Sequence, residues 1–216
     1  KTRVLLEHRA DPNARSNEFR TPLTIAARRQ GAARTVKLLL DHGANPNPSS
    51  NPSGESSPLI EAATAGDFEV MQLLFDSGAD LKDGGASALA LAINANCSKC
   101  VDLLVGKNLG KLDYTIGLGQ AAYLGDVRSM RVMLDHGAEV NAVDPTGRTT
   151  LMYAAISDIL PVEAIKLLIE RGADVNAKSK HGNSGDSGQT VLDLAKLHGE
   201  TPVVDLLIKA GATTVG

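Results

Sequence analysis

Cys97 and Cys100 form a C-x-x-C pair, a spacing found in zinc sites and in redox-active thiol proteins. A structural zinc site needs four ligands and normally a second cysteine pair, but the sequence contains only 2 cysteines. A redox pair would be expected where a strand leads into a helix. This pair instead stands at the start of a helical pattern, with Cys100 at a core-facing position. We therefore expect two ordinary helical cysteines with neither a metal-binding nor a redox role.

The other short motifs that resemble catalytic or phosphate-binding sequences also lack the partner residues that such chemistry needs. Gly185 to Gly188 read G-D-S-G, the letters around the nucleophile of trypsin-like proteases, but a serine nucleophile also needs a positioned histidine and carboxylate. The glycine-rich segment Gly182 to Gly188 lacks the G-K-[ST] that pairs with phosphates. No H-E-x-x-H and no paired-carboxylate pattern occurs. The sequence thus predicts no catalytic residue, no metal site and no cofactor, and a protein that is not an enzyme.

Residues 21–47, TPLTIAARRQGAARTVKLLLDHGANPN, predict two helices joined by a tight turn. Thr21 and Pro22 form a helix start, because the threonine hydroxyl accepts from a free backbone N–H and proline lacks only a donor that is not needed there. Gly31 ends the first helix, and Gly43 follows the second, where a left-handed cap favours a residue without Cβ. Such a hairpin cannot bury its apolar faces alone and needs copies of itself on both sides.

The copies are present along the whole chain. They begin at Ser57, Ser87, Ile116, Thr149 and Thr190, with start-to-start spacings of 36, 30, 29, 33 and 41 residues, and residues 4–14 form the back half of another copy. The pattern T-P-L-x-x-A-A, a glycine turn and V-x-L-L-L-x-x-G-A-D-x-N-A resembles the ankyrin repeat family, whose period is about 33 residues.

The resemblance implies an all-α solenoid of stacked helix-turn-helix units with short β-hairpin fingers between them. We expect a single ankyrin-repeat domain over 1–216, because each unit of a solenoid contacts only its neighbours. Its parts would be a half repeat (1–20), full repeats (21–56, 57–86, 87–115, 116–148, 149–189) and a terminal repeat without a finger (190–216). The half repeat leaves an apolar face open for further repeats or another cover, whereas the last repeat is expected to end the stack.

The repeats depart from the family pattern in informative places. Short fingers are expected at residues 83–86 and 113–115, and long, mobile ones at residues 48–56 and 177–189, which are rich in small polar residues and proline. The histidine usual after T-P-L is missing, which removes a hydrogen bond that the family uses between repeats. Its place is taken by Thr24, Ile60, Ala90, Gly119, Met152 and Asp193. In the third repeat Asn108 replaces the cap glycine, and Leu103 and Leu104 are expected to face the core.

Composition limits the possible partners. The net charge of −3 favours neither nucleic acid nor an anionic membrane, and no apolar run approaches the roughly 20 residues of a membrane-spanning helix. Residues 1–40 nevertheless hold nine Lys or Arg against three Asp or Glu, which leaves open either an acidic partner or a merely solvated helical face. The compartment is not encoded in any visible signal, with the cytoplasm slightly favoured.

In the ankyrin family, partners are generally bound by finger tips and by the exposed ends of first helices on the concave side. Carried over by position, this implies a binding surface formed by Arg20, Arg28, Arg29, Asn94, Tyr114, Tyr123, Leu124, Arg148, Ile156, Gln189, Leu197 and His198. Tyr123 and Tyr114 are expected to stand open beside the shortened finger of the fourth repeat, although both rings could instead pack over it. The implied function is recognition of another protein without catalysis. The alternative is a structural or regulatory module that docks within a longer polypeptide, and an enzyme is a more distant alternative.

Overall fold

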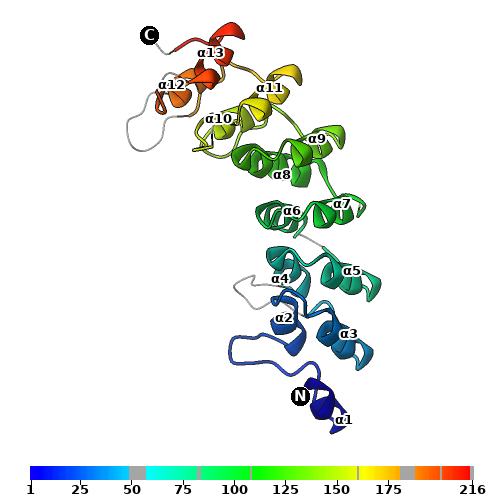
Figure 1. Cartoon of the computed structure of the whole chain (residues 1–216). Coiled ribbons are helices and arrows are strands. Elements are labelled where there is room, and N and C mark those ends of the chain that lie inside the picture. Colours follow the sequence, from blue (N-terminus) through cyan, green and yellow to red (C-terminus); the bar gives the residue numbers. More distant parts are fainter. Residues whose placement is uncertain are drawn as a thin grey trace. The chain divides into compact units, whose positions relative to one another are not determined.

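The computed structural model describes residues 1–48, 57–81, 84–107, 109–159, 161–180, 188–199 and 201–214. Within these residues the chain forms helices joined by loops (Figure 1). The helices are α1 (Thr2–Glu7), α2 (Pro22–Ala27), α3 (Ala33–Asp41), α4 (Pro58–Ala65), α5 (Phe68–Asp76), α6 (Gly85–Asn94), α7 (Ser98–Val105), α8 (Lys111–Leu124), α9 (Val127–Asp135), α10 (Thr150–Ala155), α11 (Val162–Glu170), α12 (Val191–Lys196) and α13 (Pro202–Lys209).

The chain divides into two compact units, Lys1–Leu109 and Gly110–Gly216. In the first unit α2, α4 and α6 pack on one another in one column, and α3, α5 and α7 form the neighbouring column (Figure 1). In the second unit α8, α10 and α12 form one column and α9, α11 and α13 the other. We call the columns of first helices the inner columns. The expected all-α stack of helix pairs is confirmed, while a single domain over 1–216 stays a prediction.

Polar caps fix the starts of four first helices where the sequence predicts them. Thr21 Oγ1 accepts a 3.2 Å hydrogen bond from the Thr24 amide, and Ser57 Oγ accepts one of the same length from the Ile60 amide. Thr149 and Thr190 cap α10 and α12 in the same way. Behind the caps, most alanines and leucines of the inner columns are buried, and the small alanines let neighbouring first helices approach closely.

A ladder of asparagines joins successive repeats. The side-chain amides of Asn13, Asn47, Asn141 and Asn176 each donate to the carbonyl of the cap glycine one repeat later, and their oxygens accept from the amide two residues beyond, at 2.7 to 3.1 Å. Leu112 stands at the equivalent position of the third repeat. There Thr115 Oγ1 accepts from the Glu139 amide at 3.0 Å but donates its own hydrogen to the Lys111 carbonyl. Thr115 therefore supplies only the accepting half of the asparagine's role.

Two expected repeat starts are wrong by several residues. Helix α6 begins at Gly85, before Ser87, and α8 begins at Lys111, before Ile116. The expected finger at residues 113–115 is part of α8, because Asp113 Oδ2 accepts the Gly110 amide at 2.9 Å and so starts the helix early.

The expectation that Tyr114 stands open is also wrong. Its side chain is only 5% exposed, and its ring lies against His136, with 5.3 Å between ring centroids. His136, like His8 and His42, lies at the end of a second helix, where its Nδ1 is 2.8 Å from the carbonyl oxygen four residues earlier.

The third repeat corrects two further expectations. Cys97 and Cys100 are joined by a disulfide, so the interpretation as two separate thiols is wrong. Cys97 is the N-cap of α7 and Cys100 the third residue of that helix, which places their Cα atoms 5.2 Å apart, within disulfide range. Cys100 faces the core as expected. Leu104 is fully buried but Leu103 is only half-buried, so the expectation that both face the core holds fully for Leu104 alone.

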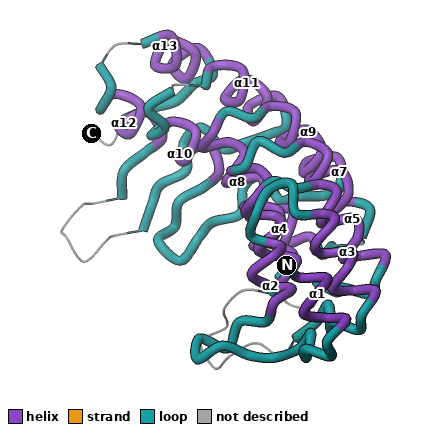
Figure 2. The backbone as a smooth tube through the Cα atoms, turned by 60° about the horizontal axis from the view of Figure 1, so that its bottom comes forward, coloured by secondary structure: helices purple, strands orange, loops and turns teal. Residues whose placement is uncertain are grey.

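Loops link each helix pair to the next, and in the described residues they contain isolated bridges instead of continuous strands (Figure 2). Val143 pairs with Thr149 in one finger, and Lys178 with Thr190 in the following one. The two fingers touch through the Lys180 amide, which donates to the Thr146 carbonyl at 2.9 Å. Residues 49–56 and 181–187, on which the expected mobility of the long fingers depends, lie outside the described residues, as does Asn108.

Candidate functional site

A groove of about 570 Å³ opens in the second unit between α8, α10 and the finger that joins their repeats. We call it the α8–α10 groove. One wall is a stripe of α8 side chains at helical spacing, and the opposite wall comes from residues 142–145, Arg148 and one face of α10. The stripe consists of Leu112, Thr115, Ile116, Gly119, Gln120 and Tyr123.

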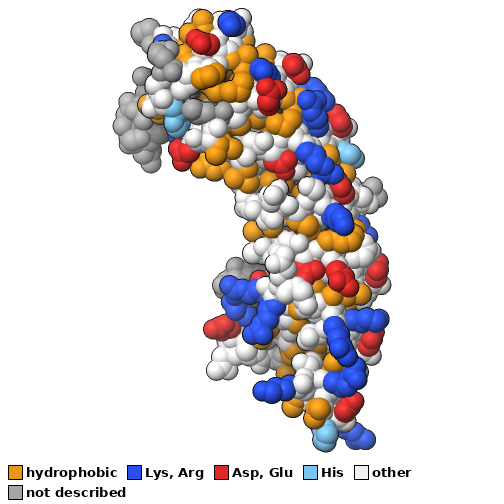
Figure 3. Space-filling model, viewed as in Figure 1, with side chains coloured by type: hydrophobic (Ala, Val, Ile, Leu, Met, Phe, Trp, Pro, Cys, Tyr) orange, Lys and Arg blue, Asp and Glu red, His pale blue; other side chains and the backbone are white. Residues whose placement is uncertain are grey.

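The groove is rich in exposed apolar side chains. Leu112 is 71% exposed, Val143 54%, Ile116 46% and Tyr123 41%. Hydrophobic side chains gather beside α8 and α10 on the face shown in Figure 3. Clustered apolar exposure of this kind marks interaction surfaces more often than scattered single residues do.

The early start of α8 explains why this stripe is uncovered. Residues 113–115, expected to be a finger, are part of a helix that begins at Lys111, so Leu112 and Ile116 project from a helix and not from a hairpin that folds over it. Gly119 adds to the opening, because a Cβ built there meets no described atom within 4 Å. Gly119 stands where the family has its histidine, so the lost side chain leaves space in the wall.

Asp144 and Tyr153 hold the finger wall in place. Asp144 Oδ1 accepts from the Thr146 amide and hydroxyl at 2.8 and 2.7 Å and from the Arg148 amide at 2.9 Å. The Tyr153 hydroxyl donates to Asp144 Oδ2 at 2.6 Å. Both carboxylate oxygens are therefore used within the protein.

These hydrogen bonds also shift the pKa values of Asp144 and Tyr153. Partial burial by itself raises the pKa of the Asp144 carboxyl, but hydrogen bonds from the Tyr153 hydroxyl, the Thr146 side chain and two backbone amides together bring that pKa below its ordinary value. The hydrogen bond to Asp144, followed by burial and the carboxylate's charge, raises the pKa of Tyr153. Asp144 is thus held as the anion.

Three residues expected to bind a partner line the α8–α10 groove: Tyr123, Arg148 and Ile156. Tyr123 is open as expected, and its carbonyl accepts a 2.6 Å hydrogen bond from the Ser157 hydroxyl, which ties the end of α8 to the end of α10. Leu124 is 38% exposed and follows Tyr123 without lining the groove. Tyr114, buried against His136, is removed from the candidate surface.

The remaining candidates of the second unit belong to its last repeat. Leu197 is 70% exposed, and His198 and Gln189 are half-buried. The Gln189 carbonyl accepts from the Ser179 amide at 3.0 Å, so this residue helps to close its finger. None of the three lines the groove.

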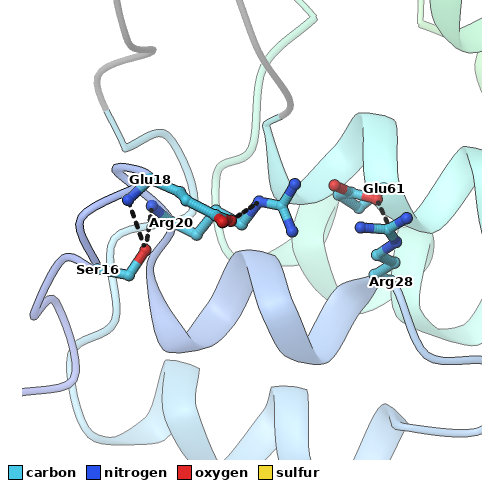
Figure 4. Close-up of polar contacts among 5 residues, drawn as sticks. All are labelled: Ser16, Glu18, Arg20, Arg28 and Glu61. Carbon is cyan, nitrogen blue, oxygen red and sulfur yellow. Dashed lines mark hydrogen bonds and ion pairs between the residues drawn. The ribbon is translucent and has the colours of Figure 1, made fainter.

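Four candidates lie in the first unit. Arg20 Nε is 3.6 Å from Glu18 Oε2, and Arg28 Nε is 3.8 Å from Glu61 Oε2, a nearly buried carboxylate on α4 (Figure 4). Arg29 and Asn94 are exposed. Basic side chains gather beside α2 on the face shown in Figure 3. Since Arg20 and Arg28 already have carboxylate partners, their charges are partly neutralised within the chain.

The sequence interpretation missed much of the groove. Leu112, Ile116, Val143 and Pro145 line it but were not among the expected residues. A signal was present: Leu112 replaces the ladder asparagine, and an exposed leucine there has no structural role in the ladder.

Two negative findings concern the described residues alone. None of their helices is both long and apolar enough to cross a bilayer. In the same part of the chain, no three His, Cys, Asp or Glu side chains are grouped so as to hold a metal ion.

Comparison with known families gives extensive matches. A model for ankyrin repeats in three copies matches residues 48–117, 89–179 and 118–215, and a model for the single ankyrin repeat matches residues 19–51. The ankyrin repeat and KH domain-containing protein mask-1 of Caenorhabditis elegans is 33% identical over 213 residues, which cover 97% of this chain and 8% of the relative. The ankyrin repeat domain-containing protein SAT10 of Stachybotrys chartarum is 27% identical over 247 residues, which cover 97% of this chain and 12% of the relative. The chain thus spans a small part of these relatives' length.

Solved structures give the same fold. The ankyrin repeat domain of human ASB11 superposes with a TM-score of 0.73 at 25% identity, covering 90% of this chain and 85% of that one. The ankyrin repeat domain of Bcl-3 superposes with a TM-score of 0.68 at 24% identity, covering 96% of this chain and 90% of that one. This match supports the fold alone.

Proposed function

This chain belongs to the ankyrin repeat family, and from that premise we propose that it recognises another protein, without catalysis, on the face formed by its inner columns and fingers. Ankyrin repeat domains are generally protein–protein interaction modules and generally lack enzymatic activity. The partner is expected to be a protein and not a nucleic acid, since the net charge of −3 gives no overall attraction to phosphates.

The α8–α10 groove is the observation that supports this proposal most. It combines exposed apolar side chains with walls fixed by hydrogen bonds, such as those between Tyr153 and Asp144 and between Ser157 and Tyr123. A preformed surface loses little conformational entropy when a partner binds, so more of the contact energy appears as affinity. Tyr123 is the expected anchor, because tyrosine offers a large rigid contact area and is enriched among binding hot spots.

The alternative is that the groove takes another part of the same, longer polypeptide. The observation favouring it is that the matched stretch covers 8% and 12% of two relatives' lengths. A pull-down that uses the complete gene product and the present chain side by side separates the two. A partner captured by the present chain but not by the complete product would indicate intramolecular docking.

The direct test uses Tyr123→Ala in the intact protein. We expect the free energy of unfolding to change by less than roughly 1 kcal/mol, since the ring is partly exposed, and partner binding to weaken by about 2 kcal/mol or more. A matched control is Ile208→Ala, which removes an exposed apolar side chain on α13, outside the groove and outside the expected binding residues. Unchanged binding by Tyr123→Ala would move the proposed surface to Arg20, Arg28 and Arg29 on the first unit.

A further inference from the structure

We propose that the α8–α10 groove selects a short protein segment in which a large apolar side chain lies beside a carboxylate, with Arg148 as the residue that reads the carboxylate. This inference rests on the proposed function and specifies the chemistry of its partner. It follows from two features of the groove, an uncovered apolar stripe and a cationic side chain whose backbone amide is bonded within the finger.

The apolar stripe sets the size of the segment. Leu112, Ile116 and Tyr123 span eleven helical steps of α8, or about 16 Å, which an extended chain of about five residues would cover. Gly119 lies between Ile116 and Tyr123, and the empty space above it leaves room for one inserted side chain. Val143 lines the opposite wall of the groove, on the finger. A side chain inserted between the two walls would therefore meet apolar surface on both sides.

Arg148 accounts for the proposed preference of the groove for a carboxylate. It lines the groove and is half-buried, and within the described ranges its guanidinium has neither a hydrogen bond nor an ion pair. A guanidinium offers five N–H donors in a planar fork that matches a carboxylate. Arg20 and Arg28, by contrast, each have a carboxylate within 4 Å. Arg148 is therefore available to an acidic group from outside.

The groove's own carboxylate does not compete for the same role. Asp144 accepts three hydrogen bonds at Oδ1 and one at Oδ2, all from its own finger and from Tyr153. Because its acceptor sites are used, a basic residue of a partner would gain little from Asp144 and would meet Arg148 nearby. The charged group of the groove whose hydrogen-bonding sites remain available to a partner is thus the guanidinium of Arg148.

The test is selection from a random peptide display library on the full chain, with wild type, Arg148→Gln and Arg148→Glu. Arg131→Gln is the matched control, since Arg131 is exposed on α9 in the same unit and outside the groove. Wild type and the control should enrich peptides that combine an aliphatic or aromatic residue with Asp or Glu. Arg148→Gln should lose the acidic enrichment and weaken a selected peptide by about tenfold or more, and Arg148→Glu should select Lys or Arg instead.

Two results would overturn the inference in distinguishable ways. If apolar peptides are enriched without an acidic bias, or with the same bias in Arg148→Gln, the carboxylate preference is wrong while protein recognition by the groove stands. If selected peptides bind Gly119→Leu, in which a side chain occupies the groove, as tightly as wild type, the groove is not their site and the proposed surface fails with it. Circular dichroism of each variant checks that it is folded.

Discussion

The hydroxyl of Tyr153 lies 2.6 Å from Oδ2 of Asp144 and joins the first helix of the fifth repeat to the finger that precedes it. Asp144 in turn fixes the turn at the finger tip through Thr146 and the Arg148 amide. One carboxylate thus sets the positions of both Arg148 and Val143 relative to α10, and the finger wall of the α8–α10 groove depends on it.

Removing this hydroxyl should loosen the finger. We expect Tyr153→Phe to lower the free energy of unfolding by about 1 kcal/mol, the usual net value of one hydrogen bond in a partly solvated site. Urea denaturation followed by circular dichroism measures the change. Tyr123→Phe is the control, since the Tyr123 ring is exposed in the groove. An equal loss in both variants would show that the Tyr153–Asp144 bond contributes nothing specific.

The same bond should give a defined pH dependence. The pKa of Asp144 is lower in the folded than in the unfolded protein, so its stabilising effect is complete above the unfolded value of about 4 and is lost as the pH falls through the folded pKa. The raised pKa of Tyr153 acts at the other end, where stability is complete below about pH 10 and is lost as the pH rises through its folded pKa. The difference in unfolding free energy between wild type and Tyr153→Phe should therefore be constant near neutrality and shrink toward both extremes. A difference that grows on acidification would contradict this assignment.

Sequence patterns predicted the helix pairs well because their signals are local. The hydroxyl of Thr21 followed by Pro22 specifies a helix start whatever surrounds it. Helix α8 could not be predicted in this way. Its early start depends on Asp113 accepting the Gly110 amide and on Tyr114 packing against His136, the residue that ends α9. The candidate surface failed at Tyr114 because this residue was assigned to a finger that is helical, and it missed Leu112, which directly precedes that expected finger.

The rotation of α7 can be tested with two adjacent leucines. Leu104 is fully buried and Leu103 half-buried, so Leu104→Ala should cost about 2–5 kcal/mol of unfolding free energy and Leu103→Ala clearly less. Each variant serves as the control for the other, because the deleted atoms are the same. Chemical denaturation of both proteins gives the comparison. Equal costs, or a larger cost at Leu103, would show that α7 is rotated differently.

The disulfide between Cys97 and Cys100 should be detectable and modest in effect. Alkylation without reduction should leave the protein mass unchanged, whereas reduction first should allow both cysteines to be labelled. Because the closed loop is short, loop-closure entropy limits the stability lost on reduction to about 2 kcal/mol. Cys97→Ser should lose no more than reduction does, since serine can cap α7 as the Cys97 sulfur does. Two thiols labelled in the unreduced protein would disprove the bond.

Gly119 offers a test in which stability and binding move in opposite directions. A helical glycine costs roughly 0.5–1 kcal/mol relative to alanine, and the new Cβ would meet no described atom within 4 Å, so Gly119→Ala should stabilise the protein by about that amount. The same change at Gly147 should destabilise it, because φ there is +77° and the added Cβ would approach the Lys180 amide nitrogen to 2.5 Å. Gly119→Leu should remain folded but fill the α8–α10 groove, and partner binding should fall while the melting temperature does not. A destabilised Gly119→Ala would mean that the space over this glycine is occupied within the protein itself, and full binding by a folded Gly119→Leu would place the partner elsewhere on the chain.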